Sequence, residues 1–227
     1  MAGDARSGLP RLRDTRGPLW VIVTGVVSLA YAIVRYNVFK GVPWEQLPAY
    51  VVNKAAAVSA VTLLAGSYLA GRGIPLEARD PERRLVAKFL GLCGFWAAGL
   101  HAILSLALLS PAYYPKFFAG DKMTFAGELA MLAGALGLLG MALPAASSLP
   151  NMEEALGRRW WRRAQRGGYL ALAMAAAHTA AMGLPGWFRP GEWPGGLPPI
   201  TLIGFLIAAL PLAARLRRGS GPPSGAR

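Results

Sequence analysis

The two histidines of this chain both lie in the middle of apolar stretches. His101 ends the stretch RRLVAKFLGLCGFWAAGLH, and His178 ends the stretch GRRWWRRAQRGGYLALAMAAAH. Lys88 precedes His101 by 13 positions, and Arg166 precedes His178 by 12. An ionisable side chain deep in hydrocarbon is costly unless it faces a partner, a cavity or a cofactor. If both stretches are helices that enter a membrane from the same side, the two imidazoles reach nearly the same depth.

Two imidazoles at one depth on neighbouring helices can ligate the iron of a b-type haem, because helix bundles build cofactor sites from facing side chains. The residues that share a helix face with each histidine are Gly94, Ala97, Ala98 and Ser105 for His101, and Ala171, Met174, Ala175 and Met182 for His178. The small face around His101 leaves room for a macrocycle. In the alternative interpretation, small faces only let the helices pack closely, and each histidine forms a hydrogen bond across an interface.

Cysteine chemistry does not offer a competing metal centre. The single Cys93 lies in an apolar run, which excludes a disulfide framework. The sequence has no CxxC or CxxCH motif for an iron–sulfur cluster or a c-type haem. Any metal centre must therefore use other ligands.

The composition is that of a membrane protein. Hydrophobic residues make up 54% of the chain and charged residues 15%, with a mean hydropathy of +0.38, whereas ordinary soluble domains are about a quarter charged. A net charge of +13 could suggest binding to nucleic acid. The arginines, however, flank apolar runs, as expected for loops on the cytoplasmic side of a membrane. We therefore predict a lipid bilayer as the environment and no nucleic acid partner.

We predict an all-α polytopic protein whose residues 18–216 form a bundle of six transmembrane helices. The expected spans are 19–36, 49–70, 85–109, 123–143, about 168–184, and 200–216. Residues 1–17 and 217–227 are basic and polar, and we expect them to be disordered. For the first apolar run, a cleaved signal peptide with a cleavage site near Ser28-Leu29-Ala30 is the alternative.

Charge asymmetry predicts that both termini are cytoplasmic. With six spans, 18 of the 24 lysines and arginines fall on the side of the termini and 6 on the other side. The third and fifth spans are then parallel, so the equal depths of the two histidines are preserved. At about 1.5 Å per residue, both imidazoles lie roughly 18 to 20 Å from the inner flank, in the outer half of the bilayer.

The stretch LPAASSLPNMEEALGRRWWRRAQRGGYLALAMAAAH resembles the ferric reductase-like transmembrane domain family. In that family a helix ends in a Thr/Ser-Ser pair, a short arm follows, and a Trp-basic-His-Arg segment leads to Tyr-Leu and a further histidine. RRLVAKFLGLCGFWAAGLH similarly resembles the family's third helix. The family includes the haem-bearing membrane subunit of the bacterial protein-methionine-sulfoxide reductase system, and the membrane cores of ferric reductases and NADPH oxidases.

The resemblance implies a six-helix bundle in a bacterial inner membrane that carries haem b and passes electrons across it. His101 and His178 match ligand positions of the family. Gln165 departs from the pattern, because many relatives have histidine there and an amide is a poor haem ligand. With no second histidine on the third span either, we expect one haem only. We also expect no FAD- or NADPH-binding domain, since the chain ends soon after the sixth span.

Other charged residues have a structural and a functional interpretation. Lys54 lies near the outer end of its span and can simply pair or reach the interface. In the functional interpretation, Lys54, Arg35 or Lys122 contacts haem propionates that project towards the outer face. The segment RRWWRR suggests a topology signal with interfacial tryptophans, and alternatively a docking site for a reductase or anionic lipid.

We therefore expect the electron-transfer component of a membrane oxidoreductase, which delivers electrons to an acceptor at the outer face. The expected donor is a quinol or a separate soluble flavin reductase, so a flavin or a quinone is a further candidate cofactor. The rival hypothesis is a non-redox membrane protein, such as a transporter or an assembly scaffold, that retains the fold without haem.

Overall fold

A computed structural model describes residues 16–71 and 80–219 of the chain. The predicted disordered ends, 1–17 and 217–227, fall mostly outside these ranges. The described elements are α1 (Gly17–Ile33) with a π-helical extension (Val34–Phe39), a 3-10 turn (Trp44–Gln46) and a π-turn (Leu47–Val51) before α2 (Val52–Ala70), then α3 (Pro81–Ala107), a 3-10 turn (Pro115–Phe117), β1 (Phe118–Ala119), β2 (Lys122–Met123), α4 (Phe125–Ala146), α5 (Met152–Trp187), 3-10 turns at Pro190–Glu192 and Pro194–Gly196, and α6 (Ile200–Gly219).

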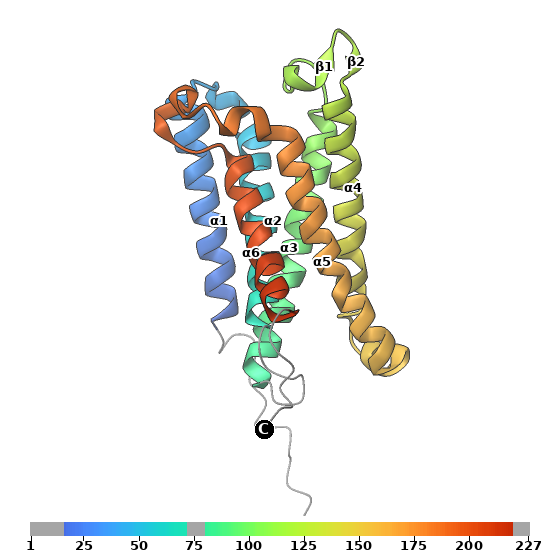
Figure 1. Ribbon diagram of the computed structural model, residues 1–227. Helices are drawn as coiled ribbons and strands as arrows, with labels where there is room; N and C mark the ends of the chain where they lie inside the picture. The colour runs from blue at the N-terminus through green and yellow to red at the C-terminus, as the bar shows by residue number, and fades with distance from the viewer. Residues whose placement is uncertain (1–15, 72–79, 220–227) are drawn as a thin grey trace, which may run out of the picture.

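The long helices lie side by side, and consecutive helices run in opposite directions (Figure 1). The start of α1 and the end of α6 lie at the same end of the bundle, which we call the basic end. Many of the described arginines and lysines lie at this end: Arg16, Arg83, Arg84, Lys88, Arg158, Arg159, Arg162, Arg163, Arg166, Arg215 and Arg217. The antiparallel β1–β2 hairpin lies at the opposite, hairpin end. Helices α3 and α5 run in the same direction, as the equal-depth argument requires.

The described chain has five helical segments long and apolar enough to cross a membrane: Gly17–Phe39, Trp44–Ala70, Pro81–Ala107, Phe125–Ala146 and Pro194–Arg217. Large apolar side chains point away from the bundle, among them Trp96, Phe125 and Phe188, which are more than two-thirds exposed. Outward apolar surface of this extent indicates an integral membrane protein. Helix α5 is not among these five segments.

Helix α5 begins earlier than the sequence pattern suggested. We expected residues 147–167 to be a connection, but helix begins at Met152 and continues for 36 residues. Asn151 has a φ of 61° and turns the chain after α4, and Glu153 and Glu154 suit the positive end of the new helix dipole. Gly157 interrupts the helix with φ 70° and ψ 151°, a conformation that favours glycine. The arginine-rich segment is therefore a helical arm and not a loop.

Close approach between helices depends on glycine at a few positions. A Cβ on Gly140 of α4 would lie 3.2 Å from the backbone nitrogen of Ala171 on α5. A Cβ on Gly94 of α3 would lie 3.1 Å from the backbone nitrogen of Leu64 on α2. At Gly94 the small side chain thus serves close packing, which is the alternative that the sequence left open. The central core is formed by small and branched residues of α2, α4, α5 and α6.

Candidate functional site

The structure brings the imidazoles of His101 on α3 and His178 on α5 into contact, edge to face. Their ring centroids are 6.1 Å apart, and the two ring planes are nearly perpendicular, at 77°. The backbones of α3 and α5 barely touch elsewhere in the described chain, since α2 and α4 take up most of their packing surfaces. Both histidines are only half-buried. The imidazoles therefore meet across an opening between two helices rather than inside a tight helix contact.

Each imidazole is held through the same ring nitrogen. His101 Nδ1 lies 2.6 Å from Oδ1 of Asn53, and His178 Nδ1 lies 2.7 Å from the backbone oxygen of Ala130. An oxygen of either kind can only accept, so both Nδ1 atoms donate. Within residues 16–71 and 80–219, neither Nε2 has a hydrogen-bond partner. Both rings thus have the tautomer that leaves a lone pair on Nε2, as a metal ligand needs.

Gly134 makes the hydrogen bond between His178 Nδ1 and the Ala130 carbonyl possible. The carbonyl of Ala130 lies inside α4, where the backbone N–H four residues later, at Gly134, is its usual partner. A Cβ on Gly134 would lie 3.0 Å from Nδ1 of His178 and 3.3 Å from Cε1. The missing side chain therefore gives the imidazole access to a helix carbonyl that a larger residue would cover.

Asn53 on α2 accepts the corresponding hydrogen bond from His101 Nδ1, and it belongs to a buried polar network. Its side chain is fully buried and lies 3.0 Å from both the Ser105 hydroxyl and the Tyr114 hydroxyl, through Nδ2. Ser105 lies one helical turn after His101 and also approaches Oδ1 of Asn53, at 3.3 Å. The sequence alone did not single out Asn53 as a partner of His101. A polar residue in an apolar run was the available signal, but its contact with His101 depends on helix packing.

The arrangement fits two axial ligands of one iron. With a metal–nitrogen bond of about 2 Å on either side of the metal, and the radius of each ring, two imidazoles on one iron have centroids roughly 6 Å apart. The described residues contain no group of three or more His, Cys, Asp or Glu that could hold a metal ion by themselves. Two imidazoles leave the other coordination positions of an iron open, and a macrocycle would fill them.

Cations without carboxylate partners lie near the hairpin end. Lys54, next to Asn53, is buried, and its Nζ lies 4.8 Å from the ring centre of Tyr50 and 4.6 Å from that of Tyr114. Burial and the positive charges of Lys116 and Arg35 lower the pKa of Lys40, which lies over Tyr36. A buried ammonium is costly without a counter-charge. The described chain shows no ion pair for Lys54.

The other two candidate propionate contacts differ from Lys54. Arg35 is buried in the π-helical extension of α1 and donates through Nη1 to the backbone oxygen of Leu197, while its Nε has no hydrogen-bond partner. Lys122 is exposed on β2. Among the three, only Lys54 lies beside a residue that contacts a histidine of the pair.

A cavity of about 1140 Å³ opens at the basic end between α2, α3, the end of α4 and the arm of α5. Its apolar lining includes Leu64, Leu92 and Met141, and its aromatic lining includes Tyr68, Trp161 and Tyr169. The charged lining is mainly basic: Arg84, Lys88, Arg158, Arg162 and Arg166, against Glu153 and Glu154. The cavity thus combines an apolar interior with a positively charged mouth.

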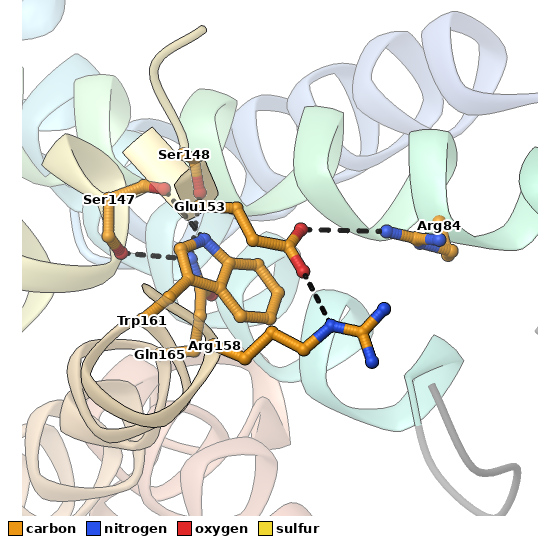
Figure 2. Close-up of polar contacts among 7 residues, drawn as sticks. All are labelled: Arg84, Ser147, Ser148, Glu153, Arg158, Trp161 and Gln165. Carbon is orange, nitrogen blue, oxygen red and sulfur yellow. Dashed lines mark hydrogen bonds and ion pairs between the residues drawn. The ribbon is translucent and has the colours of Figure 1, made fainter. Parts of the chain in front are cut away.

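Gln165 and Trp161 close the end of α4 at this cavity (Figure 2). The Gln165 amide nitrogen lies 3.0 Å from the Ser147 hydroxyl, 3.1 Å from the Ser148 hydroxyl and 3.2 Å from the Pro144 carbonyl. Trp161 Nε1 donates to the Ser147 carbonyl at 2.9 Å. The last carbonyls of a helix lack partners within the helix. Gln165 therefore has a structural role as a cap.

Glu153 joins the arm of α5 to α3 across the mouth of the cavity. Its carboxylate lies 3.9 Å from Arg84 and 3.9 Å from Arg158 (Figure 2). All three side chains are exposed to a large extent, so each ion pair contributes at most about 1 kcal/mol. The mouth can therefore widen at little cost.

Comparison of the chain with models of known protein families and with curated proteins finds no match.

Proposed function

We propose that this protein is a membrane electron carrier of the ferric reductase-like type, in which His101 and His178 hold one b-type haem. The observation that supports it is the pair of facing imidazoles, 6.1 Å apart, each fixed through Nδ1 and each with a free Nε2. Close packing alone would not require both rings to have the ligand tautomer. A haem in this position supplies a one-electron carrier within the bilayer.

The protein's own residues position such a group. Asn53 and the Ala130 carbonyl orient the two ligands through their hydrogen bonds to Nδ1. Lys54 is the best placed of the three candidate propionate contacts, because it is a buried cation beside Asn53 with no carboxylate partner in the described chain. A propionate there would supply the missing negative charge.

The proposed topology has six spans, with the basic end in the cytoplasm. Five spans satisfy length and composition alone, and α5 runs alongside them (Figure 1). The excess of arginine and lysine at the basic end supports this orientation. Electrons would then leave at the hairpin end, towards an acceptor outside a bacterial inner membrane.

The cavity at the basic end is the proposed entry for the electron donor. Its apolar interior and aromatic residues suit the ring of a quinol or a flavin, and its basic mouth suits an acidic reductase. Because no histidine lines the cavity, we propose one haem and not two. A donor in the cavity would stand in place of the inner haem found in relatives.

A spectrum of the purified protein tests the proposal. Protein from cells supplied with haem should show, after reduction with dithionite, the α band of a low-spin b-type cytochrome. His101→Ala and His178→Ala should each abolish the low-spin signal, whereas Gln165→Ala should keep it, because Gln165 only caps α4. A protein without haem, or a histidine variant with a normal low-spin spectrum, would reject the proposal in favour of a transporter or scaffold.

A further inference from the structure

We propose that Asn53 is the positioning residue that fixes the ligand tautomer of His101 and tunes the redox potential of the iron. The inference rests on the proposed function for its redox part. The tautomer part concerns the protein alone and can be measured without haem.

The side-chain amide of Asn53 uses all of its polar atoms in this role. Nδ2 has two hydrogens, and two acceptors lie at 3.0 Å, the hydroxyls of Ser105 and Tyr114. Oδ1 remains, and it lies 2.6 Å from Nδ1 of His101. With both amide hydrogens committed, the group that faces the imidazole is an acceptor, so the ring proton must lie on Nδ1.

Burial isolates the hydrogen bonds of Asn53 from water. Asn53 has no exposed surface, so water cannot replace any of its partners. Rotating the amide by half a turn would place its N–H₂ group against His101 and leave its oxygen facing the two hydroxyls. The imidazole would then have to accept at Nδ1 and carry its proton on Nε2, where it could not bind iron. In the amide orientation that the structure has, Oδ1 faces the imidazole, and this orientation favours the tautomer with the proton on Nδ1 before any cofactor arrives.

The same contact affects redox properties once iron is bound. A stronger acceptor at Nδ1–H makes the imidazole more basic and stabilises the ferric state over the ferrous state. Asn53 is a neutral acceptor, which gives its hydrogen bond with Nδ1–H of His101 an intermediate strength. His178 has a backbone carbonyl instead, which no side-chain substitution at Ala130 can remove. Asn53 is therefore the position at which sequence can adjust the potential.

Two substitutions separate the parts of this inference. In Asn53→Asp, an ionised carboxylate keeps the acceptor and strengthens it. We expect low-spin haem to be retained, with the ferric state favoured about tenfold more than in the parent, which is about 59 mV lower in potential for one electron. In Asn53→Leu, the acceptor is lost, and we expect a mixture of tautomers and a smaller low-spin fraction at equal haem supply.

Asn37→Asp is a matched control. Asn37 is also a buried asparagine, but it donates to the backbone oxygens of Val42 and Pro43, near the end of α1. Its substitution makes the same chemical change away from the histidine pair. It should lower the melting temperature, because a carboxylate cannot donate to those carbonyls, but should leave the potential of the remaining folded protein unchanged.

Nitrogen NMR of haem-free protein labelled at histidine gives the independent measurement. The chain has only two imidazoles, and both should be protonated at Nδ1 in the parent. Asn53→Leu should change one of them, and Asn37→Asp neither. A parent imidazole protonated at Nε2, or an unchanged spectrum in Asn53→Leu, overturns the inference even if haem binds. A correct tautomer in protein that never binds haem rejects the proposed function and retains the positioning role.

Discussion

The contact between Gly134 and His178 offers a sharp test of the candidate site. Replacing Gly134 with alanine adds one methyl group, whose ideal position is 3.0 Å from Nδ1 of His178 and 3.3 Å from Cε1. Ordinary contacts of a methyl group with a ring atom are about 3.5 to 4.0 Å. The imidazole cannot retreat without losing its bond to the Ala130 carbonyl. We therefore expect the ring to shift by several tenths of an ångström and its Nε2 to leave the ligand position.

The size of the effect follows from the cost of overpacking. Inserting a methyl group into a well-packed interior costs about 1 to 3 kcal/mol. If this packing cost affects mainly the haem-bound state, the free energy of haem binding becomes less favourable by the same amount. The affinity for haem then falls about 5- to 150-fold. The α helix itself should gain up to about 1 kcal/mol from replacing glycine with alanine. Gly134→Ala should therefore weaken haem binding without lowering the melting temperature of haem-free protein by the full packing cost.

Haem titration of the purified protein, followed through the low-spin spectrum, measures this effect. Gly25→Ala is the matched control, because it makes the same change in the apolar helix α1, where a Cβ would meet nothing within 4 Å. The control should bind haem as the parent does. If Gly134→Ala binds haem with parental affinity and an unaltered spectrum, then His178 does not hold iron in the orientation described here.

Three further outcomes are expected. A reporter fused after Arg218 should be active in the cytoplasm, and one inserted near Gly120 should be active outside, because the end of α6 and the hairpin lie at opposite ends of the bundle (Figure 1). The reverse pattern would refute the proposed orientation. Gln165→His should add no second low-spin haem, because no histidine lines the cavity that could serve as the second ligand. A ratio near two haems per chain in a pyridine haemochrome assay would contradict the one-haem proposal. Lys54→Met should weaken haem retention about tenfold if the ammonium pairs with a propionate, and it should raise the melting temperature of haem-free protein. Lys122→Met, on the exposed hairpin, should do neither. Equal effects of the two variants in haem titration and thermal melts would count against a specific propionate contact.

The sequence predicted the helices and the similar depth of the two histidines, because both depend on periodic, local information. Apolar runs of sufficient length define the helices, and helical rise converts 13 and 12 residues into similar depths. The structure confirms the membrane-protein class and the nearly all-helical fold. The six-span count and the orientation remain predictions, since no membrane is part of the structure.

The oxygen partners of the histidines could not be predicted from the sequence. Asn53 and His101 are 48 residues apart, and so are Ala130 and His178. Their contacts depend on the rotation of each helix about its axis, and the sequences of α2 and α4 have too little amphipathic character to define it. The early start of α5 was missed for a different reason. Arginine and tryptophan beside an apolar run suggest a membrane boundary, but neither residue type prevents helix from continuing through it.

The distribution of side-chain sizes determines where this protein can tolerate substitution. Many of its large apolar residues, such as Trp96 and Phe125, point outwards, and several of its closest helix contacts place glycine against the backbone of a neighbouring helix. Lipid chains accommodate almost any apolar shape, so exchanges among leucine, isoleucine, valine and phenylalanine on the outer surface should be nearly neutral. The inner positions admit almost no enlargement. A deep mutational scan should therefore show the reverse of a soluble protein's profile, with large residues replaceable and small residues fixed.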